Sequence, residues 1–338
     1  MAEYRVLVVT NHWPTADDAG CGAFLQAQME SLRPLGVQYD VLFINGRQSK
    51  RNFLRAIGEV RRRVSKGHYH LIHAFFSPSG WVACFQFRIP IVVSFDAGEV
   101  LGRPTSRGRI TLYGRLLQFS SLFLSRLVSG VIVKSQEMRR TLWLGSAHVI
   151  PKGIDLELFR PMDQVAAREV LGLDRAKKYV LFPYDSADVR KRFDLVEEAV
   201  ARARAYFREL EILLVQGEPQ QRMPLYMNAA DMLVMASMFE GSPNAVKEAM
   251  ATNLPVIAVP VGDVPEVVGS TEGCYLVPRD AGSITDKIVE VCRRGSRTQG
   301  REWVADFSFE NVANQIVSVY AEVAAGGKKS REPAADKS

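Results

Sequence analysis

Two carboxylates on either side of a short turn are the residues of this 338-residue chain best placed to do chemistry. Glu240 precedes the turn and Glu248 follows after seven intervening residues. The turn and the residues after it supply further candidate ligands: Gly241, Ser242, Pro243 and Asn244. Because serine before proline is typical of a helix N-cap and first turn, we expect a helix to start at Ser242. Its free amides would form an anion site, with one carboxylate toward a sugar and the other toward a ribose on either side of a diphosphate.

Three consecutive cations form a second candidate group. Arg190, Lys191 and Arg192 follow a strand-like run that ends near Tyr184. Cations at the carboxyl end of a strand are suited to clamp a diphosphate, and Lys191 with Arg190 or Arg192 is the candidate clamp. The alternative is that these residues are the solvated start of a helix. Glu248 has a similar alternative, since a glutamate on a helix can face solvent or pair with a neighbouring cation.

Short β-branched runs alternate with amphipathic segments along the whole chain, which predicts parallel sheets with crossover helices. The ten runs are 5–10, 39–44, 70–75, 90–95, 130–135, 179–184, 211–216, 231–237, 255–261 and 274–278. The fold class is therefore α/β, with two consecutive Rossmann-like, doubly wound units. Ligands of open α/β sheets bind at the carboxyl ends of the strands, where Lys191 and Glu240 lie. We expect the two sheets to face each other across an interdomain cleft.

The sequence also predicts where the domains begin and end. Prolines and a glycine between residues 148 and 161 mark the junction, so we expect domains over 1–155 and 156–306. A helix is expected over 307–325. Residues 326–338 have a composition that cannot bury a core and are expected to be a disordered tail.

The net charge of +6 hides an asymmetry between the two parts of the chain. Residues 1–160 hold 21 basic and 11 acidic side chains, whereas residues 161–338 hold 22 basic and 26 acidic ones. The cationic excess concentrates in 47–68 and 103–127, and the first stretch has apolar residues at helical spacing with arginines around them. Such a helix could attach to an anionic membrane surface; the alternative is an ordinary crossover helix with solvated charges. The basic stretches form no recognisable nucleic-acid module, so nucleic acid is a poorer explanation.

Other classes of protein are disfavoured by the cysteines, the histidines and the N-terminus. Four widely spaced cysteines lack metal or redox spacing, and no cysteine or carboxylate completes a zinc site with His68, His70 and His73, so we expect no metal. The chain opens on a strand-like run and has no 18-residue uncharged apolar stretch. This predicts a cytoplasmic protein, at most peripheral on the inner face of a membrane. The first strand is followed by NHWPTADDAGCG and not by GxGxxG, which disfavours a dinucleotide-dependent oxidoreductase.

The segment FEGSPNAVKEAMATNLPVIAVPVGDVPEVV (239–268) resembles the signature segment of retaining family 4 glycosyltransferases, which have the GT-B fold. Further segments resemble parts of that family in the expected order: the loop ending in Gly22, SFDAGEVLG (94–102), RKRFDL (190–195), NAADMLVMAS (228–237) and FSFENVANQIVSVYAEVA (307–324). The resemblance covers nearly the whole chain. Within the family it is nearest to the branch for teichuronic-acid and capsule-type polysaccharides.

The resemblance implies transfer of a sugar from a nucleotide diphosphate sugar, with UDP or GDP as the nucleotide, to a hydroxyl of a glycan or glycolipid. Configuration would be retained, and neither a metal nor a cofactor would be needed. Glu248 would hold the ribose hydroxyls and Glu240 the donor sugar, while the amides of Gly241 through Asn244 would bind the sugar or the diphosphate. The donor's own phosphate would deprotonate the acceptor hydroxyl.

The same resemblance assigns roles to the two domains. The first would face the acceptor and the second would bind the nucleotide sugar, and helix 307–325 would cross back onto the first. Gly22 would approach the phosphates from the first domain, and Lys191 with Arg190 would bind them from the second.

The chain departs from the family pattern at three places. Tyr184 and Asp185 stand where the family commonly has an arginine, and Phe95 and Asp96 stand where it often has a histidine. Asp96 is thus a candidate for orienting the acceptor or the donor sugar, or else a turn residue. Residues 215–223 are short where family members carry a strand and a base-reading loop, so the sequence leaves the base open. Two other functions stay open as well, a sugar-nucleotide epimerase and a non-catalytic nucleotide-sugar-binding module.

Overall fold

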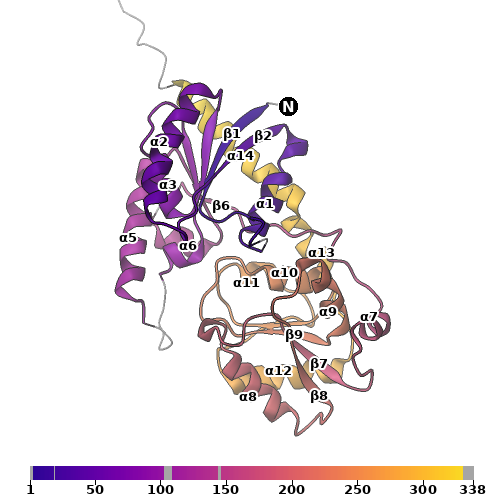
Figure 1. Cartoon of the computed structure of the whole chain (residues 1–338). Helices are drawn as coiled ribbons and strands as arrows, with labels where there is room; N and C mark the ends of the chain where they lie inside the picture. Colours follow the sequence, from indigo (N-terminus) through magenta and orange to yellow (C-terminus); the bar gives the residue numbers. More distant parts are fainter. Residues whose placement is uncertain (1–2, 19, 103–108, 144–145, 330–338) are drawn as a thin grey trace, which may run out of the picture. The chain divides into compact units, whose positions relative to one another are not determined.

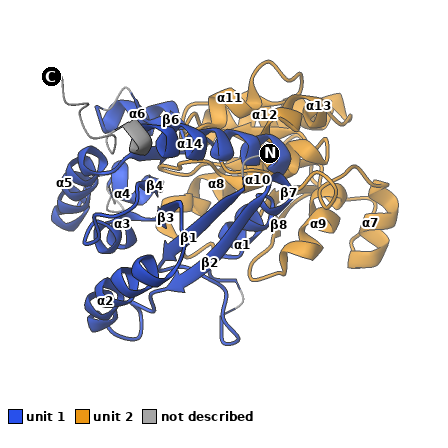
Figure 2. Ribbon diagram, turned by 90° about the horizontal axis from the view of Figure 1, so that it is seen from above, with its two compact units in different colours: residues 1–105, 109–151, 309–338 blue, residues 106–108, 152–308 orange. Residues whose placement is uncertain are grey.

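The computed structural model describes residues 3–18, 20–102, 109–143 and 146–329. These residues form two compact units, shown in different colours in Figure 2. The second unit takes residues 152–308, and the first takes the described residues before 152 together with those after 308. Each unit is an α/β fold with a parallel sheet, as predicted.

The first unit contains a six-stranded sheet in the order β2-β1-β3-β4-β5-β6. Its strands are β1 (Tyr4–Thr10), β2 (Val37–Phe43), β3 (Leu71–Phe75), β4 (Ile91–Ser94), β5 (Gly130–Val133) and β6 (His148–Val149). The central strands are buried on both faces, which explains their continuous β-branched runs. Five of the six strands were predicted, whereas β6, a two-residue strand at the edge of the sheet, was missed.

Helices cover both faces of this sheet. They are α1 (Ala23–Glu30), α2 (Arg51–Lys66), α3 (Ser77–Ala83), α4 (Ala97–Val100), α5 (Leu112–Leu127), α6 (Gln136–Thr141) and α14 (Phe309–Lys329), with a 3₁₀ turn, η1, at Arg33–Leu35. Figure 1 shows α2, α3 and α5 on one side of the strands and α1 and α14 on the other. The core of the second face joins residues of α1, such as Met29, to Val312, Ile316 and Tyr320 of α14.

The last helix therefore completes the core of the first unit, although it comes at the end of the chain. The Tyr320 hydroxyl lies 2.6 Å from Nδ1 of His73, whose Nε2 lies 2.8 Å from the Ser94 hydroxyl. Burial holds the pKa of His73 well below its usual value, so the neutral ring links α14 to β3 and β4. This histidine thus has a structural role.

The ends of α14 differ from those expected. The helix begins at Phe309 because residues Ala305–Phe307 form a separate 3₁₀ turn, η4, and Ser308 is extended. It ends at Lys329, so residues 326–329, expected in a disordered tail, are helical. Residues 330–338 lie outside the described residues.

The second unit contains a five-stranded sheet in the order β11-β10-β9-β7-β8. Its strands are β7 (Lys178–Phe182), β8 (Leu210–Leu214), β9 (Met232–Met235), β10 (Val256–Ala258) and β11 (Tyr275–Leu276), and all five were predicted. Its helices are α7 (Gln164–Leu171), α8 (Phe193–Ala203), α9 (Met223–Ala229), α10 (Asn244–Ala251), α11 (Val264–Val268), α12 (Ala281–Arg294) and α13 (Gly300–Val304), with 3₁₀ turns η2 (Val189–Lys191) and η3 (Gln220–Arg222).

Helices α8 and α12 lie on one face of this sheet and α9, α10 and α11 on the other (Figure 1), and each face has its own apolar core. One contains Val196 and Val200 of α8 with Ile288 of α12, and the other contains Val246 and Met250 of α10 with residues of α9 and α11. Strand β8 is followed by η3 and α9, without a further strand in 215–223. No helix among the described residues is both long and apolar enough to cross a membrane.

Candidate functional site

Four side chains gather at the carboxyl end of the second unit's sheet, and we call them the Tyr184 cluster: Tyr184, Lys191, Glu240 and Glu248. Tyr184 lies two residues beyond β7, Lys191 lies in η2, Glu240 lies in the turn after β9, and Glu248 is on α10. Lys191 Nζ is 2.5 Å from Glu240 Oε1 and 4.2 Å from the centroid of the Tyr184 ring. The fold thus brings together the two carboxylates and the lysine that the sequence singled out.

Glu248 is a buried carboxyl group. Its residue is 8% exposed, and burial raises the pKa to about 7. A hydrogen bond with the Gln220 side chain and the charge of Lys247 act in the opposite direction, but burial is the larger effect. A carboxyl group in this state is ready to accept hydrogen bonds from ligand hydroxyls, and each such bond favours its ionised form. The interpretation of Glu248 as a solvated helix residue is therefore wrong.

Tyr184 was noted in the sequence as a departure from the family pattern, and the structure makes it part of the cluster. Its hydroxyl is buried and has no hydrogen-bond partner among the described residues. Burial raises its pKa well above the usual value, and the charges of Glu240 and Glu248 raise it further. The hydroxyl is therefore neutral and close to both carboxylates. Its position directly after β7, at the ligand-binding edge of the sheet, was the available sequence signal.

Two more buried polar atoms lack partners near the same strand ends. Among the described residues, neither Ser237 Oγ, just after β9, nor Asn244 Oδ1, at the start of α10, has a hydrogen-bond partner. Buried polar groups are normally paired, and each unpaired one costs about 1–3 kcal/mol. Like the Tyr184 hydroxyl, these atoms are buried polar groups near the carboxyl end of the sheet whose hydrogen-bonding capacity is unused among the described residues.

The three cations at 190–192 differ in their hydrogen-bond partners. Arg190 binds Asp188 through two nitrogens, at 2.8 and 2.6 Å, and Arg192 binds Asp194 at 2.9 and 2.7 Å. Both guanidinium groups are therefore already paired with a carboxylate two residues away. Arg192 also has a left-handed backbone, with φ of 55°, and lies at the start of α8. For this residue the alternative interpretation, the start of a helix, is the one that the structure favours. Lys191 is the member of the trio that reaches the cluster.

Arg279 is a cation that the sequence analysis missed. It follows β11, and its side chain donates hydrogen bonds to the carbonyls of Ser237 at 3.2 Å and Met238 at 3.0 Å. Within the described residues it has no ion pair. Burial and the charge of Arg192 lower its pKa from the usual arginine value, which still leaves it charged at neutral pH. An unneutralised positive charge thus lies at the end of β9.

The expected cap at Ser242 is wrong. Helix α10 begins at Asn244 with Pro243 as its N-cap residue, and no side chain caps it. The unpaired amides of the first turn are those of residues 244–246. Ser242 is instead buried among charges: its hydroxyl donates to Asp263 Oδ2 at 2.6 Å and accepts from the Lys152 amide at 2.9 Å.

A buried ion pair explains why Ser242 is used in this way. Lys247 Nζ is 2.7 Å from Asp263 Oδ2, their side chains are 0% and 5% exposed, and the lysine also contacts the Ser242 hydroxyl. We call these three residues the Ser242 triad. Both charges lie away from water, so the lysine and the aspartate stabilise each other, and the Ser242 hydroxyl contacts both. The triad therefore fixes the loop that carries Glu240.

Gly262 holds the same loop from the other side. Its φ is +60°, and a Cβ there would lie 2.6 Å from the Gly241 carbonyl oxygen and 2.7 Å from that of Glu240. A side chain larger than hydrogen would therefore push the turn of Glu240 and Gly241 away from the sheet. The loop 262–266 thus positions the candidate site.

The two candidate residues of the first unit have clear local roles. Gly22 has φ of +76°, and a Cβ there would lie 2.7 Å from the His12 carbonyl and 2.8 Å from the Trp13 nitrogen, so the fold of loop 11–22 requires glycine. Asp96 caps α4 in a reciprocal capping box with Glu99. Contacts of either residue with a substrate remain predictions.

The first basic stretch packs as an ordinary crossover helix. Within α2, Val60 and Val64 are buried, and Glu59 pairs with Arg62 at 2.6 Å and with Arg63 at 2.7 Å. Arg61 donates a hydrogen bond of 2.7 Å to the Phe85 carbonyl. Several arginines of 47–68 thus form contacts within the protein. This favours the interpretation of the stretch as an ordinary crossover helix over its attachment to a membrane.

Both parts of the chain match models of known glycosyltransferase families. Residues 1–158 match the model described as Glycosyltransferase Family 4, and residues 188–294 match the model described as Glycosyl transferases group 1. A protein of Bacillus subtilis strain 168, named as the teichuronic acid biosynthesis glycosyltransferase TuaC, is 24% identical over 92% of this chain and 94% of its own. The phosphatidyl-myo-inositol mannosyltransferase of Mycobacterium leprae strain TN is 24% identical over 84% of this chain and 82% of its own.

Solved structures resemble the whole chain. The sucrose-phosphate synthase of Thermosynechococcus elongatus superposes with a TM-score of 0.78 at 21% identity, covering 96% of this chain and all of its own. The Anabaena protein HepE, solved with UDP and glucose, gives a TM-score of 0.66 at 16% identity over 97% of this chain and all of its own. At these identities the resemblance shows the fold.

Proposed function

Since this chain belongs to the family 4 glycosyltransferases of GT-B fold, we propose that it moves a sugar from a nucleoside diphosphate sugar to a hydroxyl of a glycan or glycolipid, with retention of configuration. The observation that carries the proposal is the Tyr184 cluster at the start of α10. It combines two carboxylates, a lysine and an unpartnered hydroxyl at the ligand-binding edge of the second sheet.

Each member of the cluster has a role in this proposal. Glu248 binds the ribose hydroxyls, and Glu240 binds hydroxyls of the donor sugar. The Lys191 ammonium leaves Glu240 for a phosphate oxygen when the donor binds, and Arg279 lies near enough to the end of β9 to support the same diphosphate. The amides at the start of α10 add the positive end of a helix dipole.

The proposed reaction develops negative charge on the diphosphate, beside the cations and amides of the site. The bond between the anomeric carbon and the diphosphate oxygen breaks, and a bond from the acceptor oxygen to the same carbon forms. The acceptor proton passes to a phosphate oxygen of the departing nucleotide. Negative charge grows on the diphosphate in the transition state, so preorganised cations and amides there lower the barrier.

Glu248 and Gln220 support a location for the nucleoside. Gln220 lies in η3, within the short segment 215–223, and its side chain hydrogen-bonds to Glu248. If Glu248 holds the ribose, the base lies beside this segment. We infer UDP or GDP as the nucleotide, consistent with the UDP found in HepE, and we infer a polysaccharide or glycolipid acceptor from the printed names of the relatives.

A ligand screen followed by a release assay tests the proposal. The full chain is screened by thermal shift against UDP, GDP and ADP sugars, and the best donor is then assayed for nucleotide release with and without lipid-linked glycan acceptors, in the presence and absence of EDTA. We expect stabilisation by a UDP or GDP sugar and acceptor-dependent release that EDTA leaves unchanged. An isomerised donor would instead identify an epimerase, and stabilisation without turnover would identify a binding module.

A further inference from the structure

Helix α5 carries its large apolar side chains on the outside. Five of them recur at helical spacing along one face and are 54–76% exposed, and we call them the α5 stripe: Leu112, Leu116, Phe119, Phe123 and Leu127. Three of the four residues that α5 buries are small, and two of them are polar: Gly114, Ser121, Leu124 and Ser125. A surface helix normally has the reverse arrangement, with its apolar stripe toward the core.

The buried face of α5 shows why the helix cannot turn the stripe inward. Ser121 Oγ is 2.6 Å from the Ser77 hydroxyl and donates to the Glu99 carbonyl at 3.0 Å, so polar contacts hold this face. A Cβ on Gly80 of α3 would lie 2.7 Å from the Leu124 side chain, so the two helices already meet closely. Rotating the helix would force leucines and phenylalanines into a space that fits serine and glycine.

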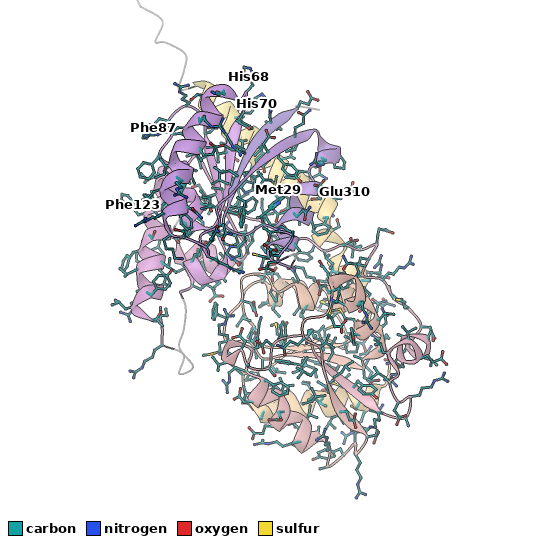
Figure 3. The ribbon with its side chains drawn as sticks, in the orientation of Figure 1. Met29, His68, His70, Phe87, Phe123 and Glu310 are labelled. Carbon is teal, nitrogen blue, oxygen red and sulfur yellow. The ribbon has the colours of Figure 1, made fainter. Side chains whose placement is uncertain are left out.

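Two further aromatic residues lie on this side of the first unit, the exposed Phe87 and the half-buried Trp81. Phe87, in the turn after α3, is 88% exposed, and Figure 3 shows it on the same side of the first unit as Phe123. Trp81 of α3 stacks on Phe123 with ring centroids 6.0 Å apart and an interplanar angle of 16°. Contiguous exposed apolar surface of this kind marks a site of interaction with a protein or a membrane.

The charges around the stripe decide between these partners. Residues 109–127, which include all of α5, contain three basic side chains, Arg109, Arg115 and Arg126, and no acidic one. Arg115 and Arg126 are exposed and lie beside the stripe on the same helix. A second copy docked through the same face would bring cations against cations, whereas an anionic lipid surface offers charge of the opposite sign and an apolar layer beneath it.

We propose that α5 is the element by which this protein docks on an anionic bilayer. The α5 stripe enters the boundary between headgroups and acyl chains, and Arg115 and Arg126 remain at the level of the lipid phosphates. The proposal deepens the proposed function, because a glycolipid acceptor would be presented at the same surface. It also assigns the docking to α5, whereas Arg61, Arg62 and Arg63 of α2 are held by contacts within the protein.

Vesicle flotation with matched variants tests this assignment. The full chain is mixed with phosphatidylcholine vesicles, with or without phosphatidylglycerol, at low and high salt. The test variant is L116Q/F119Q, which replaces side chains that are 60% and 68% exposed, and the control is V170Q/Y206Q in the second unit, at 67% and 64%. Glutamine keeps helix propensity, and circular dichroism checks that both variants fold.

We expect the wild type and the control to float with the anionic vesicles and L116Q/F119Q to bind at least about tenfold more weakly, since two large apolar contacts are lost. R115Q/R126Q should lose roughly ten- to thirtyfold in affinity for anionic vesicles, given the contribution of each near-surface cation. Equal binding by L116Q/F119Q and wild type, or no flotation of the wild type, would overturn the proposal. Concentration-dependent dimerisation that L116Q/F119Q abolishes, without vesicle binding, would also overturn it in favour of a second copy.

Donor binding separates this proposal from the proposed function. L116Q/F119Q should bind the nucleotide sugar with the wild-type dissociation constant in calorimetry, because α5 belongs to the first unit and the Tyr184 cluster to the second. If the protein binds vesicles but no nucleotide sugar, the proposed function fails while the docking role of α5 stands. If the protein transfers sugar from the donor but does not bind vesicles, the docking role of α5 fails while the proposed function stands.

Discussion

At the residue scale, the site depends on a buried hydroxyl without a partner among the described residues and on a carboxyl group whose ionised form is disfavoured by burial. The Tyr184 hydroxyl has no partner among the described residues, and the Glu248 carboxyl is protonated more readily than an exposed glutamate. Both conditions cost stability in the absence of ligand. A donor that supplies hydroxyl groups at these positions would recover that free energy as binding, which makes the two residues the sharpest tests of the site.

Replacing Glu248 by glutamine should raise the donor KM by at least about tenfold, because an ionised carboxylate is a stronger acceptor for ribose hydroxyls than an amide. Steady-state kinetics with varied donor measures this effect. Glu272, whose side chain is 87% exposed, provides the matched control Glu272→Gln, which should behave as wild type. Normal donor kinetics in Glu248→Gln would defeat the assignment of Glu248 to the ribose.

The pKa of Glu248 also makes a prediction about stability. Because its folded-state pKa of about 7 exceeds the ordinary glutamate pKa of 4.5, the folded protein holds this proton more tightly than the unfolded chain does. The resulting stabilisation is fully present below about pH 4.5 and is lost as the pH rises through 7, to a total of about 3 kcal/mol. Urea unfolding between pH 5 and 8 should show this decline in wild type, and Glu248→Gln should lack that component. Identical pH dependence in both proteins would contradict it.

Tyr184→Phe should separate binding from folding. Removing a buried hydroxyl without a partner should leave the unliganded protein as stable as wild type or about 1 kcal/mol more stable. If the hydroxyl meets the donor, the donor KM should rise by about three- to tenfold. Thermal unfolding and donor kinetics measure the two effects, with Tyr206→Phe, an exposed tyrosine, as the control. An unchanged donor KM would remove Tyr184 from the site.

At the scale of elements, the Ser242 triad ties α10 and the loop before α11 to the turn that carries Glu240. Lys247→Met should destabilise the second unit by about 3–5 kcal/mol, because it leaves the Asp263 carboxylate buried without a counterion. Hydrogen exchange of the α10 amides in denaturant would measure the loss. Lys287, which pairs with Glu290 on the surface of α12, is the control, and Lys287→Met should cost less than about 1 kcal/mol. Equal effects of the two substitutions would show that the triad adds little.

The elements were more predictable from the sequence than the contacts between them. Ten of the eleven strands in the described residues were predicted, because short apolar runs bounded by turn residues are a local pattern that the sequence shows directly. Ser242 was assigned as a cap because serine before proline normally caps a helix. Its hydroxyl instead bonds to Asp263, which lies on another loop, and contacts Lys247, five residues later. Arg279 reaches the end of β9 from a segment 41 residues away, a proximity that no local pattern encodes.

At the scale of the whole molecule, the first unit is assembled from both ends of the chain. Tyr320 of α14 is fully buried there, and its hydroxyl bonds to His73. Tyr320→Phe should destabilise this unit by about 1–3 kcal/mol, because it leaves one nitrogen of a buried imidazole unpaired. Differential scanning calorimetry should show the loss in the transition of the first unit, with Tyr206→Phe, a substitution at an exposed tyrosine of the second unit, as the control. A wild-type transition in Tyr320→Phe would show that the contact contributes nothing.

The late position of α14 also has a consequence for synthesis on the ribosome. All six strands of the first sheet have been made once residue 149 has emerged, but the helix that covers one of its faces begins at residue 309. At about 5–20 residues per second, the apolar face that α14 will cover stays open for roughly ten to thirty seconds while the second unit is translated. A nascent chain of this kind is expected to need protection by a chaperone during that interval. Folding of the first unit should therefore finish only after α14 has emerged.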